Sequence, residues 1–127
     1  MVKLDHLTIA VSDWRASRDW YVRRFGFAVE FELANGGAES LGVAALQDDA
    51  GLTVFLEQRA GPIQSGQGAH ALQVDDVAAT HARLAQSGAR VLAAPGLQFW
   101  GYGAVVADPD GHILHLWDAA SMAAHQG

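Results

Sequence analysis

The sequence contains no cysteine, and its basic residues are few. Without cysteine there is no disulfide framework, no thiolate metal site and no cysteine nucleophile. The 8 Lys and Arg residues are outnumbered by 14 Asp and Glu residues, for a net charge of −6 at pH 7. Nucleic-acid binding depends on clustered basic residues that neutralise phosphates, and the longest basic run here is Arg23-Arg24. We therefore expect no nucleic-acid partner.

Long hydrophobic runs are also missing. No apolar stretch approaches the ~20 residues that a membrane-spanning helix needs. Residues 1–5 lack the apolar core of a secretory signal peptide. We expect a cytoplasmic protein with no membrane partner.

What the sequence does have is an internal repeat. Half of its 127 residues are hydrophobic, which is enough for one domain with a substantial core. Residues 5–14 and 69–77 each form an alternating, strand-like run that ends in Val-x-Asp and leads into a segment of helical character. Such a repeat determines the architecture: two similar halves, which together can enclose a pocket that neither half makes alone.

The periodicity predicts the order βαβββ in each half. Ser12 or Asp13 can cap the first helix, which Gly26 ends, and Gly88 ends the second helix over 76–87. The expected strands are 4–11, 27–33, 41–46 and 52–58 in the first half and 69–75, near 89–93, 102–107 and 112–117 in the second. The irregular parts are expected to be a turn at 35–37, a linker at 59–68, a loop at 94–101 and a frayed tail from Ala119 on.

These features resemble the vicinal-oxygen-chelate superfamily, which includes glyoxalase I, extradiol dioxygenases and bleomycin-resistance proteins. The residues that carry the resemblance are the two Val-x-Asp strand ends, Trp20-Tyr21 before Phe25-Gly26-Phe27, and Asp108-Pro109-Asp110-Gly111. The resemblance implies an α+β fold in which two βαβββ modules form a cup-shaped mixed sheet. It implies one domain over 1–127, with module one at about 4–59, a linker at about 60–68 and module two at about 69–118. Because two chains commonly pack together in this family, it also implies a homodimer.

Metal-using members of that family take one ligand from the first and last strand of each module. His6 stands at the first-strand position of module one, whereas the matching position of module two is Ala69. His70 comes one residue later, and because strand side chains alternate between faces, we expect it to point away from the cup.

The last strands offer a similarly incomplete set. His115 follows Gly111 by four residues, but the residue four after Gly51 is Phe55, which cannot bind a metal. Glu57 lies two residues further along the same face. The alternative prediction is thus a lyase, isomerase or dioxygenase that binds Zn, Fe or Mn through His6, Glu57 and His115.

The C-terminal run is most similar to the bleomycin-resistance branch, whose members bind antibiotics without metal and without chemistry. They also carry Trp-Gly before the Asp-Pro turn, as Trp100-Gly101 does here, and a histidine at the place of His115. Four Trp, two Tyr and five Phe supply surfaces that suit a flat ligand. Glu30 and Glu32 alternate with the apolar side chains of their strand and could line the rim of the cup.

The first prediction is therefore a protein that binds and sequesters a small, partly aromatic molecule such as an antibiotic. It needs no metal or other cofactor and is not an enzyme in this interpretation. The expected ligand-binding residues are His6, Phe55, Glu57, Trp100, Gly101, Tyr102, His115 and Trp117. The glycines at 101 and 103 are expected to let the backbone approach the ligand closely.

Overall fold

The computed structural model describes residues 1–34 and 41–126, so the turn expected at 35–37 lies outside the described residues. The chain divides into two compact units, Met1–Gln64 and Ser65–Gly127. Unit 1 has the elements β1 (His6–Val11), α1 (Trp14–Phe25), β2 (Ala28–Leu33), β3 (Val43–Gln47) and β4 (Thr53–Gln58). Unit 2 has β5 (Ala69–Gln73), α2 (Val77–Gln86), β6 (Arg90–Gln98), β7 (Gly101–Ala107), β8 (Ile113–Trp117) and α3 (Ala119–Ala124). Both units contain the order βαβββ, which confirms the predicted α+β fold.

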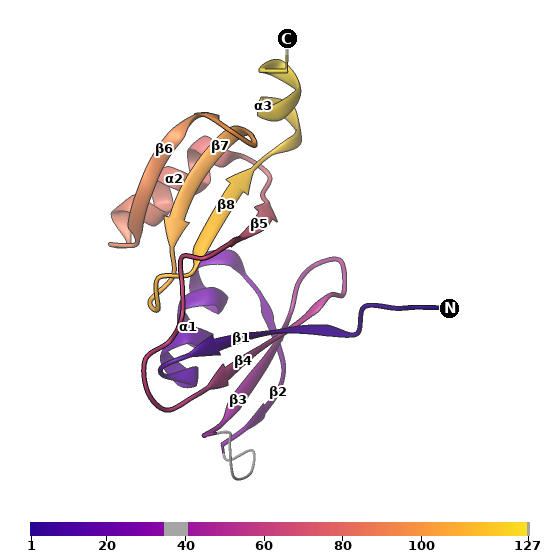
Figure 1. The fold of residues 1–127 in the computed structure, drawn as a ribbon. Helices are drawn as coiled ribbons and strands as arrows, with labels where there is room; N and C mark the ends of the chain where they lie inside the picture. The colour runs from indigo at the N-terminus through magenta and orange to yellow at the C-terminus, as the bar shows by residue number, and fades with distance from the viewer. Residues whose placement is uncertain (35–40, 127) are drawn as a thin grey trace. The chain divides into compact units, whose positions relative to one another are not determined.

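In unit 1 the sheet has the strand order β1-β4-β3-β2, and α1 packs on one face of it (Figure 1). The first and last strands, β1 and β4, run parallel, and the other pairs are antiparallel. The Asp13 carboxylate caps α1 through two backbone N–H groups, and Gly26 ends the helix with a left-handed φ of 73°. The helix-covered face holds the almost fully buried Leu46 and Leu56. Alternation along the strands therefore places the neighbouring residues, Ala45 and Phe55, on the opposite face.

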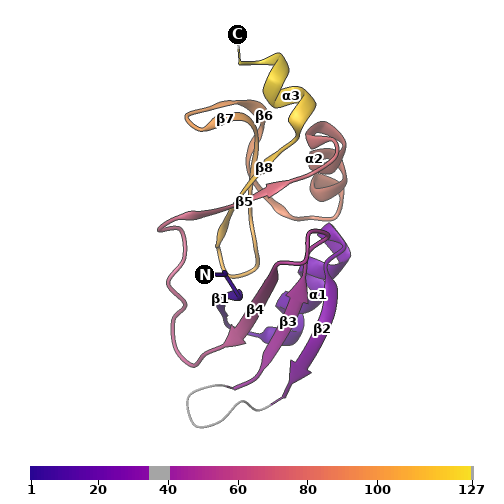
Figure 2. The ribbon, with the colours of Figure 1, turned by 90° about the vertical axis from the view of Figure 1, so that its right-hand side faces the viewer.

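Unit 2 repeats this plan with the order β5-β8-β7-β6, in which β5 and β8 are parallel (Figure 2). The helix α2 contacts β6 and β7. Leu84 of α2 and Leu114 and Leu116 of β8 are almost fully buried. The side chains that alternate with them on β8, among them His115, lie on the face opposite α2.

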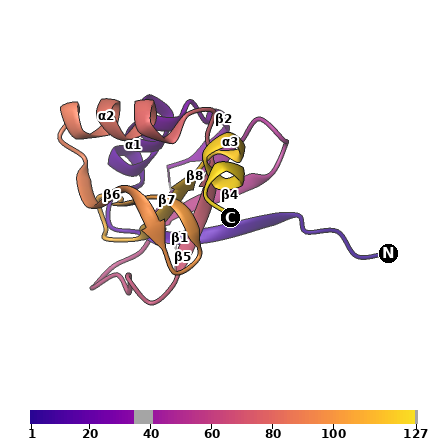
Figure 3. The ribbon, with the colours of Figure 1, turned by 90° about the horizontal axis from the view of Figure 1, so that it is seen from above.

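Two parts of unit 2 differ from the sequence prediction. The expected loop at 94–101 is largely strand, because β6 continues to Gln98 and pairs with β7 across two register shifts on either side of Ala93. The tail forms α3 instead of fraying, since the Asp118 carboxylate caps it through the Ser121 N–H (Figure 3). In the part of the chain that the structure describes, no helix is both long enough and apolar enough to cross a membrane.

Candidate functional site

Unit 1 carries a small aromatic cluster on the face opposite α1. Because β1 and β4 are parallel and in register, with Thr8 opposite Phe55, the His6 and Phe55 side chains share this face. The His6 and Phe55 rings stack with centroids 4.0 Å apart, and Phe31 meets Phe55 edge-on at 5.4 Å. The His6 Nδ1 atom lies 2.9 Å from the exposed Asp5 carboxylate, and this hydrogen bond lowers the pKa of Asp5. The structure thus brings His6 and Phe55, two residues of the predicted site, into contact.

The acidic residues expected near this cluster lie elsewhere. Glu57 pairs with Arg59, and its strand partner is Ala10, whereas His6 is paired with Thr53. Four residues of extended strand separate the two pairs, which corresponds to about 13 Å. Unit 1 therefore does not bring the His6 and Glu57 side chains to a common point.

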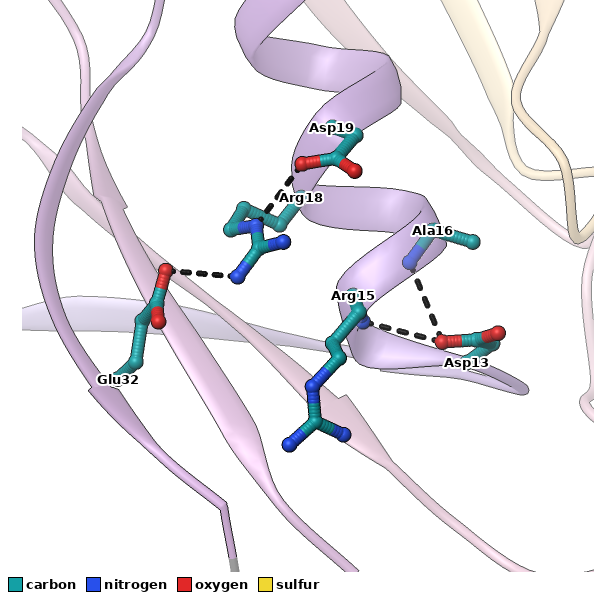
Figure 4. Close-up of polar contacts among 6 residues, drawn as sticks. All are labelled: Asp13, Arg15, Ala16, Arg18, Asp19 and Glu32. Carbon is teal, nitrogen blue, oxygen red and sulfur yellow. Dashed lines mark hydrogen bonds and ion pairs between the residues drawn. The ribbon is translucent and has the colours of Figure 1, made fainter.

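Glu30 and Glu32 fall into different surroundings. The Thr53 hydroxyl donates to the Glu30 carboxylate at 2.8 Å, so Glu30 reaches the neighbouring strand. Glu32 was expected on the rim of the cup, and this is wrong. A register shift between Val29 and Phe31 changes the alternation, and Glu32 accepts a hydrogen bond at 2.9 Å from Arg18 of α1 (Figure 4).

The same register recurs in unit 2, with different residues. Ala69 is opposite Ile113 and Ala71 is opposite His115, so Ala69 stands where unit 1 has His6. His70 is opposite the buried Leu114, which places it on the face of α2, as the one-residue offset predicts. The pKa of His70 is lowered, first by desolvation and second by repulsion from His112, whose ring centroid lies 6.3 Å away.

The clearest feature of unit 2 is a tryptophan that lies flat on a histidine. Trp100 occupies the turn between β6 and β7, and its ring stacks on His115 with centroids 4.5 Å apart and an interplanar angle of 11°. Phe99 meets His115 edge-on at 6.2 Å and is 96% exposed. We call these three residues, Phe99, Trp100 and His115, the aromatic shelf. The sequence did not indicate Phe99 as a site residue, because an exposed phenylalanine in an expected loop carries no periodic signal.

A glycine makes room for this stack. A Cβ at Gly103 would lie 2.5 Å from Cη2 of Trp100, so the indole crosses β7 where there is no side chain. Space at Gly103 was expected to serve a ligand, but Trp100 itself fills it. The glycine at 101 is also covered, because a Cβ there would lie 2.5 Å from Sδ of Met122 in α3.

The other two residues predicted for the pocket differ in their placement. Trp117 lies two residues beyond His115 in β8 and so shares its face. Tyr102 does not join the shelf, because its ring stacks on His125 with centroids 3.9 Å apart. Side chains alternate along β7, so Tyr102 lies on the face opposite to that of its neighbour Gly103, which Trp100 covers. The structure therefore places Trp100, His115 and Trp117 on one face and Tyr102 against the C-terminal helix.

Electrostatically the shelf is neutral. Desolvation by burial lowers the pKa of the His115 imidazole, and the Trp100 indole is the group that lies flat on that ring. Because an ordinary histidine titrates near pH 6.5, the lowered pKa favours the uncharged form of His115 at neutral pH. A neutral imidazole can offer one N–H donor and one nitrogen acceptor beside two apolar rings.

The donor set fits a metal ion poorly in each unit. The first-strand and last-strand positions hold His6 and Phe55 in unit 1, and Ala69 and His115 in unit 2, so each unit supplies one nitrogen ligand. In unit 1 the neighbour of the imidazole is a phenyl ring, which has no lone pair to donate. Among residues 1–34 and 41–126, no group of three or more His, Asp or Glu side chains is arranged to hold a metal ion.

Solved structures share this fold at low sequence identity. A possible glyoxalase from Bacillus cereus is similar with a TM-score of 0.73 and 19% identity, over 91% of this chain and 98% of that chain. For TioX from Micromonospora sp. ML1 the TM-score is 0.66 and the identity 24%, over 90% and 97%. A glyoxalase I mutant from Zea mays has a TM-score of 0.72 and 23% identity, over 86% of this chain and 42% of that longer chain.

Sequence comparison identifies the family of this chain. No curated protein matches the sequence. The family model for the Glyoxalase/Bleomycin resistance protein/Dioxygenase superfamily matches residues 3–116. The match spans nearly all of both βαβββ units, and the chain belongs to this superfamily.

Proposed function

We propose that this protein binds and sequesters a planar, partly aromatic small molecule, such as an antibiotic, without metal and without chemical change. The observation that carries the proposal is the Trp100–His115 stack with Phe99 beside it. An indole held flat against a second ring is ready to stack on a planar ligand, because the conformational cost of fixing it is already met. Trp100 is only half-buried, so part of the ring stays available.

The charge of the protein restricts the class of ligand that it can bind well. The three side chains of the aromatic shelf are mainly uncharged at neutral pH, and the whole chain carries a net charge of −6. Anions are repelled by such a protein, and a cation gains from its field. The ligand class that fits best is a flat molecule that is neutral or cationic, with a polar atom that can hydrogen-bond to the imidazole.

Unit 1 supports the same kind of ligand from its own face. His6, Phe55 and Phe31 form a second set of contacting rings, in which Phe55 occupies the position that His115 has in unit 2. Glu57 and its partner Arg59 supply polar groups on the same strand and just beyond it. We propose that this cluster also binds a ligand, from within unit 1.

The competing function is a metal-dependent lyase, isomerase or dioxygenase that uses His6, Glu57 and His115. The separation of His6 from Glu57 along unit 1, and the phenyl ring beside His6, speak against it. Protein purified without chelator should contain well under one equivalent of Zn, Fe or Mn per chain after dialysis. One equivalent that His6→Ala or His115→Ala removes would favour the enzyme instead.

The direct experiment is a binding screen read by tryptophan quenching. Bleomycin, mitomycin and enediyne-derived antibiotics are titrated into the protein, and at least one should bind saturably and be recovered chemically unchanged. Trp100→Ala should weaken that ligand at least tenfold, about 1.4 kcal/mol. Leu92→Ala, an exposed apolar residue of β6, is the matched control and should bind like wild type. Equal binding by the Trp100 variant contradicts the site, and an altered ligand contradicts sequestration.

A further inference from the structure

The C-terminal helix α3 is held at its first turn by one buried carboxylate. Asp118 is 3% exposed, and it accepts hydrogen bonds at 2.6 Å from the Ser121 N–H of α3 and the Val77 N–H of α2. The first of these caps α3, and the second ties the cap to the start of α2. These hydrogen bonds therefore fix the first turn of α3 relative to the rest of unit 2.

From this turn α3 reaches the first two residues of β7. The Met122 thioether covers Gly101, leaving no room for a Cβ there, and the His125 ring stacks on Tyr102 with an interplanar angle of 11°. The His125 Nδ1 atom lies 2.8 Å from the Ser121 carbonyl oxygen, which sets the orientation of that ring. Figure 1 shows α3 beyond the end of β8, in the same part of unit 2 as the β6–β7 turn.

The residues that α3 covers come directly after the tryptophan of the aromatic shelf. Gly101 has a φ of 134°, a conformation open mainly to glycine, and glycine itself does little to hold the chain in place. The direction in which Trp100 leaves the turn therefore depends on what fixes Gly101 and Tyr102. Besides the pairing with β6, Met122 contacts Gly101 and His125 contacts Tyr102.

We propose that α3 is a positioning element, which through Met122 and His125 holds the Trp100 indole over His115. Met122 and His125 hold the two residues that follow the turn, while the indole folds back across Gly103 to the imidazole. Loss of the α3 contacts lets the turn move and the stack open, although the sheet remains. The expected loss of ligand affinity rests on the proposed function, whereas the expected opening of the Trp100–His115 stack does not.

The test uses a double variant in which Met122→Ala and His125→Ala are combined, and compares it with two controls. The first control combines Met122→Leu and His125→Phe, which keeps the volume of the residue 122 side chain and a stacking ring at position 125. The second control, Gln126→Ala, changes an exposed residue of the same tail. Circular dichroism and thermal unfolding establish that each variant is folded. NMR of the His115 imidazole protons, without ligand, then reports the stack, because an indole lying flat on the ring shifts their resonances upfield.

In the double variant the His115 resonances should move toward the positions of an unstacked imidazole, while both controls keep the wild-type shift. The ligand from the binding screen should bind about fivefold more weakly to the double variant, because the shelf is no longer preorganised. His115 resonances that stay in place would overturn the proposal. If they move but no ligand binds even to wild type, the positioning role stands and the binding function fails.

Discussion

At the scale of single residues, the stack of Trp100 on His115 makes a titration prediction. The pKa of His115 is lowered by desolvation, and Trp100→Ala removes the ring that lies on the imidazole. The pKa of His115 should therefore rise toward its ordinary value in this variant, so the ring becomes charged at a higher pH than in wild type. Measuring the His115 ring protons by NMR across the pH range checks this. Leu92→Ala should leave the titration of His115 unchanged.

Gly103 provides a second prediction at this scale. A Cβ at this position would overlap the Leu116 carbonyl oxygen and lie 2.5 Å from the Trp100 ring. Gly103→Ala should therefore lower the free energy of unfolding by about 1–3 kcal/mol, as overpacking does. Urea unfolding measures the change.

Gly68→Ala is the matched control, since a Cβ there meets nothing within 4 Å. Its free energy of unfolding should stay the same or rise slightly, because alanine restricts the unfolded chain. If the two variants had equal stability, Gly103 would not be a point of close packing.

The sequence predicted part of the arrangement of these side chains. His115 and Trp100 were expected to lie near each other, and the one-residue offset of His70 correctly predicted its orientation, because alternation along a regular strand is a local property. Tyr102 and Glu32 were misplaced. Glu32 follows a register shift, which residue spacing does not reveal. The ring that contacts Tyr102 is His125, which lies in a segment that was expected to be frayed.

At the scale of elements, regular strands and capped helices were predictable and the irregular segments were not. In residues 1–34 and 41–126 each strand overlaps a predicted one, and α1 begins after Asp13, one of the two predicted caps, and ends at Gly26 as expected. The second half of β6 was missed because it contains Pro95 and Gly96, which usually signal a loop. The pairing with β7 across the register shifts stabilises this segment, and that is a tertiary effect.

Because the Asp118 carboxylate caps α3 and binds the start of α2, we expect the stability of these helices to depend on pH. Hydrogen bonds from the Val77 N–H, and then from Ser121, lower the pKa of this buried carboxyl. A carboxyl with a lowered pKa in the folded state stabilises the protein above the pKa of the unfolded chain, and this contribution is lost as pH falls through the folded pKa. The loss should therefore begin at about pH 4 and continue below it.

Asp118→Ala tests this directly. At pH 7 it should lower the free energy of unfolding by about 1–3 kcal/mol, because two helix N–H groups lose their acceptor. The difference from wild type should shrink as the pH is lowered to 3 in a series of urea unfolding curves. Asp49→Ala, in an exposed turn, should show neither effect. A difference that stays constant with pH would mean that the ionised form of Asp118 does not matter.

At the scale of the whole molecule, the two units have the same strand order and the same register between their first and last strands, but different side chains in the matched positions. His6 corresponds to Ala69, Phe55 to His115, and Glu57 to Trp117. At each of these matched pairs, one unit carries a residue that can bind a metal ion and the other unit carries a residue that cannot. The architecture followed from the repeat, whereas the chemistry depends on which residue occupies each matched position.

We expect two copies of the chain to form a homodimer. Large apolar side chains outside the aromatic shelf remain exposed on the single chain, among them Leu97 at 72% near the end of β6. Such surface is costly in water, and a second copy of the chain would cover it by symmetric packing. We expect light scattering on a sizing column to give twice the 13.5 kDa chain mass at tens of micromolar protein. Leu97→Glu should shift the protein toward the monomer, whereas Asp49→Ala should not. A wild-type protein that is monomeric under these conditions would contradict the predicted dimer.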